Sequence, residues 1–355
     1  MSGRGRACLK NRIQPCDTLA LFVYTIPMPL SLTAAADDDG RRLDRILRKA
    51  LRDLPLSAIH RLLRQGCVRV NGETAAAARR IRAGETITVT DTTSIPSAPI
   101  PPAPSRARKL EILFEGSGLL VLNKPAGLAV HGEAGAAGPP APHLAGQVLS
   151  YLSPKLPPSL SFKPGPLHRL DKPSSGVIAF SASLEGARLF SALMQEHKLK
   201  KFYLAIVQGI IGEAETWQDE LSRDRDLKKT FTGGEAHGKT KTAITRVKAL
   251  ARNNACTLIL AEIETGRSHQ IRAQAAARGH PLLGDKKYGA RPFPKNSAAS
   301  ASRKGSPASG PDFLLHAWRL EFPAGTPFPG LIEAPLPEYF RAKVRQLFGE
   351  DAVRA

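Results

Sequence analysis

The stretch from residue 168 to residue 176 reads HRLDKPSSG, and its composition is that of a site rather than of a core. Charged side chains flank a single carboxylate, Asp171, ahead of a Pro-Ser-Ser-Gly turn. The stretch lies between apolar, strand-like flanks, and polar groups at strand ends or tight turns indicate a functional site. Taken alone, Asp171 could instead cap a turn.

Three other segments have the same character. They read VLNKPAGLAVH (121–131), KKFYLAIVQG (200–209) and TGRSHQIRAQ (265–274), the last followed by GHPLLGDKKYG (279–289). Singly, Tyr203 could be a core aromatic and Arg272 a surface charge on a helix. The four segments together favour a site assembled from distant parts of the chain.

In this order, the segments resemble the RluA family of pseudouridine synthases over residues 110–340. HRLD followed by Ser-Gly is highly specific, as is TGRSHQIR followed by LLGDKKYG, whereas the KxYxAxVxG pattern is weaker. The resemblance implies an isomerase that converts uridine to pseudouridine in RNA, with large-subunit (23S) ribosomal RNA as the expected substrate. It implies neither a cofactor nor a metal, and no metal-ligand spacing or phosphate-binding glycine motif is present.

The resemblance implies roles for four residues. Asp171 matches the nucleophile, and Arg272 matches the basic residue that pairs with it and favours its ionised form. Tyr203 matches a tyrosine that packs on the base and is a candidate general base. Arg169 matches an arginine that fills the gap left when the target base is flipped out of its helix.

The chain departs from the family pattern at three positions. Gln274 stands where the family usually has histidine, and Pro173 and Ser174 stand where an acidic residue and threonine are common. These changes put target-site preference in doubt rather than activity. Lys124 matches a segment at the base of the cleft; we expect a structural role first and include it among the candidate RNA-binding residues. We expect His269 and Asp285 to anchor a turn and a helix.

A basic module precedes these segments. The pattern predicts a helix over 41–52, a second helix capped by Ser57, and strands around an Asn71-Gly72 turn and over 81–89. Residues 41–90 carry a net charge of +8 (12 basic minus 4 acidic residues). The run RLLRQGCVRVNG resembles the RNA-binding domain first described in ribosomal small-subunit protein S-four, although most charge runs are only solvated faces. The arginines of this module expected to contact RNA are Arg42, Arg45, Arg61, Arg64 and Arg69.

The whole chain of 355 residues has 51 Lys and Arg against 31 Asp and Glu, a formal charge of +20. An excess of this size favours a polyanionic partner such as RNA. A basic soluble protein without a specific partner is the alternative. The four cysteines form no paired motif, so neither a zinc site nor a disulfide framework is expected, and we expect a cytoplasmic monomer without a membrane partner.

These patterns predict an α+β protein. We expect a poorly ordered extension (1–40), a small αα-β RNA-binding domain (41–90), a Pro-rich linker (91–108) and a pseudouridine synthase domain (109–348). Long predicted strands and few helices favour a mixed, mainly antiparallel central sheet in the last. Residues 133–142 and 291–311 are expected to be disordered insertions.

The first residues resemble an export signal, but the apolar run 19–30 contains two prolines and is too short to span a bilayer. We expect translation to start at Met28. Two other functions remain open: an RNA-binding ribosome-assembly factor without activity, and a hydrolase that cuts a glycosidic bond, which ordinarily needs two carboxylates. Transfer RNA is an alternative substrate. Which uridine is modified cannot be derived from these motifs.

Overall fold

The chain divides into two compact units, residues 1–100 and 101–355, here called the N-terminal and C-terminal units. A computed structural model describes residues 30–51, 54–90, 109–132, 141–156, 159–160, 162–224, 227, 229–233, 240–291, 311–350 and 352. The predicted linker and nearly all of the two predicted insertions lie outside these residues. Among the described residues, no helix has the length and apolar character needed to cross a membrane.

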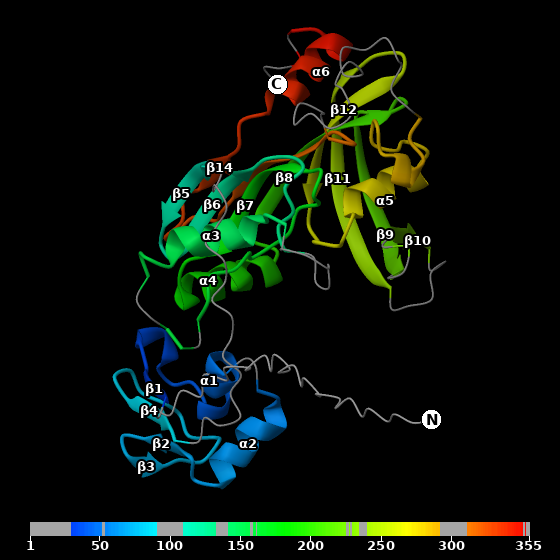
Figure 1. Ribbon diagram of the computed structural model, residues 1–355. Helices are drawn as coiled ribbons and strands as arrows, with labels where there is room; N and C mark the ends of the chain where they lie inside the picture. Colours follow the sequence, from blue (N-terminus) through cyan, green and yellow to red (C-terminus); the bar gives the residue numbers. More distant parts are fainter. Residues whose placement is uncertain are drawn as a thin grey trace, which may run out of the picture. The chain divides into compact units, whose positions relative to one another are not determined.

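The N-terminal unit contains two helices and an antiparallel sheet with strand order β1-β4-β2-β3 (Figure 1). Leu43, Ile46 and Leu47 form the buried stripe of the first helix, as the sequence predicts. Asn71 and Gly72 both have positive φ (51° and 87°), which the tight turn between β2 and β3 requires. The elements are β1 (Leu30–Thr33), η1 (Ala36–Asp38), α1 (Leu43–Ala50), α2 (Leu56–Arg64), β2 (Val68–Val70), β3 (Glu73–Thr74) and β4 (Thr86–Val89).

The predicted boundaries of this unit need three corrections. Residues 30–40 are not part of a poorly ordered extension, because β1 pairs with β4 over four residues and completes the sheet. The second helix begins at Leu56, with Pro55 rather than Ser57 at the N-cap position. The last strand begins at Thr86, since Ile81 is buried in an irregular segment instead.

The C-terminal unit is built on one ten-stranded sheet with the order β10-β9-β11-β12-β8-β13-β7-β6-β5, and β14 pairs with β13. Among the described strands, only the β13–β7 pair is parallel, which confirms the mixed, mainly antiparallel sheet. The strands are β5 (Ile112–Gly116), β6 (Leu119–Lys124), β7 (Ser175–Ser181), β8 (Lys200–Gln208), β9 (Ala214–Asp224), β10 (Lys229–Thr232), β11 (Lys241–Arg252), β12 (Cys256–Ile263), β13 (Leu315–Glu321) and β14 (Leu331–Glu333).

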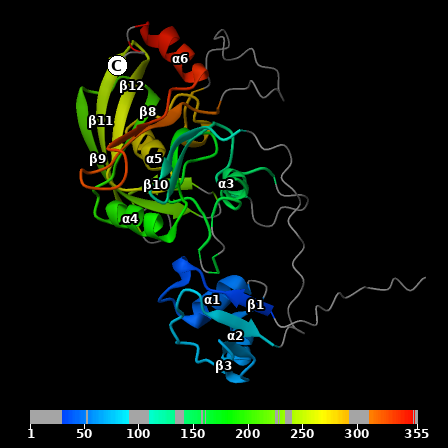
Figure 2. The same ribbon diagram turned by 90° about the vertical axis from the view of Figure 1, so that its left-hand side faces the viewer.

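Helices cover both faces of this sheet (Figures 1 and 2). Tyr203 and Ala205 of β8 face a cluster that includes side chains of α3 and α5, whereas Leu204 and Ile206 face α6. The two faces therefore follow from the alternation of side chains along each strand. The helical segments are α3 (Leu144–Leu152), α4 (Leu184–Gln195), α5 (Gln270–Ala277), η2 (Lys286–Tyr288) and α6 (Glu338–Phe348).

Candidate active site

Asp171 lies in a tight turn immediately before β7. The backbone N–H of Ser174 donates to the carbonyl of Asp171 (3.1 Å) and closes this turn. Two residues later Gly176 has φ 110°, and a Cβ built there would lie 2.0 Å from the carbonyl oxygen of Ala317. The glycine therefore permits the close parallel contact between β7 and β13, and so the Ser-Gly that follows HRLD is needed to place the turn.

Arg272 reaches Asp171 from α5. Its Nη1 donates to Oδ2 of Asp171 (2.8 Å), while Nε and Nη2 donate to the two carboxylate oxygens of Asp285 (2.6 and 2.9 Å). The guanidinium carbon lies 4.8 Å from the Tyr288 ring centre and 4.2 Å from that of Phe313. One arginine is thus held between two aromatic rings and shared by two carboxylates.

Arg272 stays protonated in spite of its burial. Its side chain is only 7% exposed. Burial lowers the pKa of Arg272, but the hydrogen bond to Asp285 and the charges of Asp171 and Asp285 outweigh burial and raise it overall. A permanently charged guanidinium therefore lies 2.8 Å from the Asp171 carboxylate. Asp285 is 1% exposed and fully engaged with Arg272, so its role is to hold the arginine in place.

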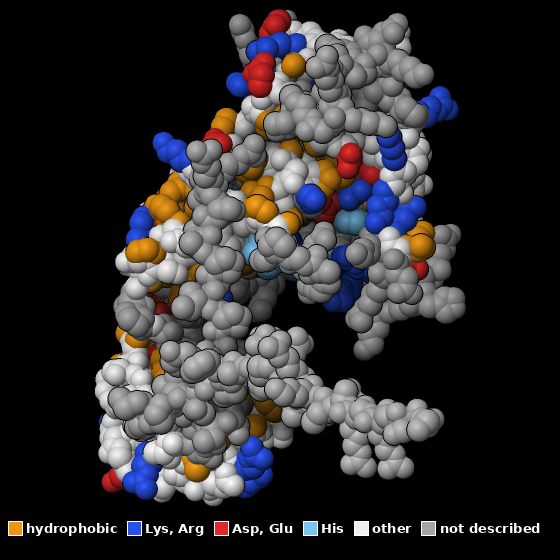
Figure 3. Space-filling view, in the orientation of Figure 1, with side chains coloured by type: hydrophobic (Ala, Val, Ile, Leu, Met, Phe, Trp, Pro, Cys, Tyr) orange, Lys and Arg blue, Asp and Glu red, His pale blue; other side chains and the backbone are white. Residues whose placement is uncertain are grey.

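Asp171 opens into a cleft of about 680 Å³. Six basic side chains line this cleft against three acidic ones. In Figure 3, Lys and Arg side chains gather on the part of this face that carries α5 and β10, and a histidine lies among them. The cleft therefore attracts anions around its single reactive carboxylate. The basic side chains are Arg169, Lys172, Arg223, Arg272, Lys286 and Lys287.

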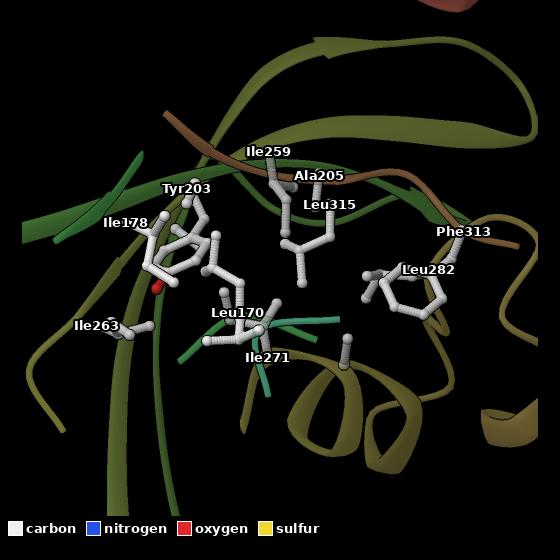
Figure 4. Close-up of a cluster of buried hydrophobic side chains, with 14 of the residues drawn as sticks. Leu170, Ile178, Tyr203, Ala205, Ile259, Ile263, Ile271, Leu282, Phe313 and Leu315 are labelled. Carbon is white, nitrogen blue, oxygen red and sulfur yellow. The ribbon is translucent and has the colours of Figure 1, made fainter. Parts of the chain in front are cut away.

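Tyr203 does not line this cleft but lies in the hydrophobic cluster behind it. The cluster surrounds Tyr203 with side chains that include Leu170 and Ile178 (Figure 4). Tyr203 is 8% exposed. Burial, and next the charge of Asp171, raise the pKa of Tyr203 above its ordinary value. The phenol therefore keeps its proton at neutral pH.

Lys124 is fully buried, and its place among the candidate RNA-binding residues is a mistaken prediction. Its Nζ donates to the carbonyl oxygens of Pro125 (2.9 Å), Leu128 (2.8 Å) and Lys172 (3.2 Å). Burial lowers the pKa of Lys124 to about 7, although the Asp171 charge opposes this. Three carbonyl acceptors match the three donors of an ammonium group. Lys124 therefore ties its own loop to the backbone next to Asp171.

The departures from the family pattern lie outside the cleft or at its margin. The Gln274 amide donates to the carbonyl of Trp217 (3.0 Å) and to Asp219 (2.7 Å) and is fully buried. It stabilises the contact between α5 and β9 and does not line the cleft. Pro173 lines the cleft. Within the described part of the chain, the buried Ser174 hydroxyl has no hydrogen-bond partner.

The arginines that the sequence assigns to RNA binding are all exposed, and they lie in both units. Arg169 lines the cleft two residues before Asp171. Arg42 forms an ion pair with Asp44 (2.8 Å). The other four arginines of the N-terminal unit that the sequence assigns to RNA binding, all exposed, are Arg45, Arg61, Arg64 and Arg69.

Sequence reasoning missed several residues that line or support the cleft. Arg223 is the next-to-last residue of β9, a strand that was not predicted, and Phe313 borders a low-complexity stretch. Tyr288 lies inside the segment GHPLLGDKKYG, so this motif could have indicated Tyr288 as a site residue. Among the described residues, no group of His, Cys, Asp and Glu is arranged to hold a metal ion.

Comparison with known proteins identifies both units. Residues 118–277 match the RNA pseudouridylate synthase family, and residues 41–87 match the S4 domain. Ribosomal large subunit pseudouridine synthase D of Neisseria meningitidis serogroup A is 33% identical over 298 residues, covering 82% of this chain and 75% of that protein. Ribosomal large subunit pseudouridine synthase C of Escherichia coli K12 is 31% identical over 334 residues, covering 88% and 94%.

A solved structure agrees at the level of the fold. The structure titled Human RNA Pseudouridylate Synthase Domain Containing 4 has a TM-score of 0.51 at 22% identity, covering 69% of this chain and 93% of that one. The resemblance that the motifs HRLD and TGRSHQIR indicate is thereby confirmed. The chain belongs to the RNA pseudouridylate synthase family and carries an S4 domain ahead of its synthase domain.

Proposed function

We propose that this protein converts uridine to pseudouridine in large-subunit ribosomal RNA, with Asp171 as the nucleophile. One observation carries the assignment of the nucleophile: the Asp171 carboxylate lines a basic cleft and accepts a hydrogen bond from the guanidinium of Arg272 at 2.8 Å. The relatives named as ribosomal large subunit pseudouridine synthases support the choice of RNA.

The chemistry requires the target base to leave its helix, because a stacked uridine cannot be attacked. In the proposed path, the ribose–N1 bond breaks with participation of the Asp171 carboxylate. The uracil then turns and bonds to the ribose through C5. Finally C5 loses a proton and N1 gains one, so the product is an isomer of the substrate. Arg169, exposed at the cleft, is the residue that would occupy the place of the flipped base.

Tyr203 has a narrower role in this path. The raised pKa of Tyr203 disfavours a free phenolate. The hydroxyl can therefore accept the proton from C5 only if it passes its own proton to an acceptor, the outlet, at the same time. The charge of Asp171 acts on Tyr203, which makes that carboxylate a candidate outlet. We therefore assign Tyr203 to the late proton transfer, with its ring packed in the hydrophobic cluster.

RNA affinity in this proposal comes from two basic surfaces. The cleft has an excess of basic side chains, and the described part of the N-terminal unit presents eight exposed arginines, which include the five predicted to bind RNA. Phosphate contacts of this kind give sequence-independent affinity. A monomer acting in the cytoplasm fits the proposal.

The other functions considered fit the site less well. A hydrolase with two working carboxylates would need Asp285 free, but Asp285 is buried and bound to Arg272 at both oxygens. An inactive assembly factor has no need of the intact Asp171–Arg272–Asp285 arrangement. Transfer RNA as substrate is tested by the parallel assay of the two kinds of RNA.

The test is Asp171→Asn in the full-length protein, with tritium release from 5-³H-uridine RNA as the readout. We expect turnover to fall at least about a thousandfold while RNA binding is retained, since the amide is not a nucleophile. Glu185→Gln, the same change of charge on α4, is the matched control and should leave turnover unchanged. More than a hundredth of wild-type turnover in the Asn variant would refute the assignment. Large-subunit ribosomal and transfer RNA transcripts, assayed in parallel, decide the substrate.

A further inference from the structure

His269 has a backbone conformation that histidine rarely adopts. It is the N-cap residue of α5 with φ 54° and ψ 24°, in the left-handed region. Of the four described non-glycine residues with positive φ, only His269 lines the cleft. Strained backbone of this kind gathers at functional sites, where it aims a side chain. The question is what the imidazole is aimed at.

The imidazole lies between a tyrosine hydroxyl and the nucleophile. Nδ1 of His269 is 2.9 Å from the Tyr288 hydroxyl, and Nε2 is 3.6 Å from Oδ1 of Asp171. The other Asp171 oxygen, Oδ2, accepts from Arg272. Arg272 and His269 therefore face different oxygens of one carboxylate.

The backbone determines which imidazole nitrogen carries the proton. The N–H of Thr230 donates to the Tyr288 hydroxyl oxygen (3.0 Å), so the hydroxyl is free to donate its own proton to Nδ1 of His269. A neutral imidazole that accepts at Nδ1 carries its proton on Nε2. In this tautomer the N–H is on the nitrogen that lies 3.6 Å from Oδ1 of Asp171, whereas the other tautomer would place a lone pair against a carboxylate.

We propose that His269 is a positioning residue for the nucleophile: the N–H dipole of its neutral imidazole sets the rotation of the Asp171 carboxylate and directs Oδ1 to the flipped nucleotide. The inference rests on the proposed function of Asp171. The 3.6 Å separation between Nε2 and Oδ1 is longer than a hydrogen bond. The imidazole dipole therefore orients Oδ1 without engaging its lone pairs, which stay available for the ribose carbon. A second cation at this place would instead neutralise the carboxylate.

The electrostatic surroundings keep the imidazole neutral. Burial lowers the pKa of His269 to about 4. Asp171 opposes this effect, whereas Arg272, Arg223 and Lys287 reinforce it. At neutral pH His269 therefore acts as a dipole rather than as a charge.

The first test is His269→Asn in the full-length protein. Asparagine tolerates positive φ but is too short to reach Asp171. We expect kcat to fall on the order of 10- to 100-fold with KM changed less than about threefold, because carboxylate orientation matters in the transition state rather than in binding. His197→Asn is the matched control, since His197 is exposed, has φ 55° and also hydrogen-bonds through Nδ1, to the Glu264 carbonyl. It should leave kcat unchanged.

The second test reads the tautomer directly. ¹⁵N NMR of labelled histidine should show His269 as the neutral Nε2–H form at about pH 7. Tyr288→Phe keeps the ring beside Arg272 but removes the hydroxyl, so it should give a mixture of tautomers and a several-fold lower kcat. This measurement decides the matter even if the His269 variant does not fold.

The outcomes separate this inference from the proposed function. If His269→Asn turns over within about twofold of wild type, or if NMR shows an imidazolium or an Nδ1–H form at about pH 7, His269 does not position Asp171. If Asp171→Asn stays active in the same assay, the proposed function itself fails.

Discussion

Arginine is used in opposite ways in the two units. Arg42 of the N-terminal unit has a side chain 44% exposed and pairs with Asp44, two residues away in the sequence. Arg272 of the C-terminal unit is 7% exposed and joins Asp285 to Asp171, which lies 101 positions away. The Arg42–Asp44 pair joins residues that are close in sequence, whereas the Arg272–Asp171 pair forms only after the sheet has assembled.

The contrast shows what each surface is suited to. Exposed arginines remain free to exchange a solvated partner for a phosphate, which supports affinity without a fixed geometry. A buried arginine held by two carboxylates and two aromatic rings cannot move away, so it supports a fixed geometry. The difference can be measured in stability, pH dependence, turnover and salt dependence.

The largest expected effect comes from Arg272→Ala. It leaves Asp285 buried without a partner, so we expect the C-terminal unit to lose about 3–5 kcal/mol of its free energy of unfolding, and turnover to be lost as well. Arg42→Ala, the control, should leave the denaturant midpoint unchanged because its pair is exposed. Urea unfolding of both variants checks the difference. Equal midpoints would mean that the buried arrangement is no more important for stability than the surface pair.

Next comes the pH dependence of stability in the C-terminal unit. Burial lowers the pKa of His168 and of His316 from 6.5 to about 4. Because the folded pKa lies below the unfolded one, this stability is fully present above pH 6.5 and is lost as pH falls towards 4. The loss is up to about 1.4 kcal/mol per pH unit for each histidine.

Urea unfolding across this pH range is the measurement. His168→Gln removes one titrating group. The number of protons taken up on unfolding, which sets how steeply the free energy of unfolding changes with pH, should therefore fall by about one. His168 accepts the N–H of Ala179 at Nε2 (3.0 Å), a bond that the glutamine carbonyl can retain. Stability independent of pH between 6.5 and 4 would contradict the burial of neutral histidines.

Tyr203→Phe should act on turnover with little effect on folding, because the ring remains in its cluster. If the hydroxyl takes part in the proton transfer from C5, turnover falls by about a hundredfold or more. RNA affinity should not change, since Tyr203 is buried behind the cleft. Single-turnover tritium release tests this prediction, and wild-type rates in the Phe variant would leave Tyr203 with packing alone.

The smallest effect concerns the N-terminal unit. A fragment of residues 109–355 should fold and retain Asp171 chemistry, because the chain divides near residue 100. Its affinity for RNA should be lower, on the order of tenfold, and should depend less steeply on salt, since exposed arginines are lost. Titrations across a salt series compare the two proteins. An unchanged salt slope would exclude the N-terminal unit as an RNA-binding element.

Several elements could be predicted from local sequence because local physics decides them. Ser183 caps α4 by accepting the N–H of Gly186 (3.0 Å), as its position before an amphipathic run indicates. Strand β12 spans Cys256–Ile263, a run of mostly apolar residues with the β-branched content that favours a strand. The Asn71-Gly72 turn forms where its two residues tolerate positive φ.

Other elements were missed for a physical reason. All seven residues of β7 are buried, so the strand lacks the alternation that marks a half-exposed strand. Strand β1 is only four residues long and follows a segment that resembles an export signal. Its pairing with β4 depends on residues more than fifty positions away.

Sequence alone determined the family, the order of the two units and the identity of Asp171, Arg272 and Arg169 as candidates, because specific motifs are written in consecutive residues. The tertiary structure decided which side chains face the cleft. It turned Lys124 inward to three carbonyls, set Tyr203 behind the cleft and brought His269 to Asp171. The burial and the partner of a polar side chain depend on chain segments far away in sequence, and no local pattern contains them.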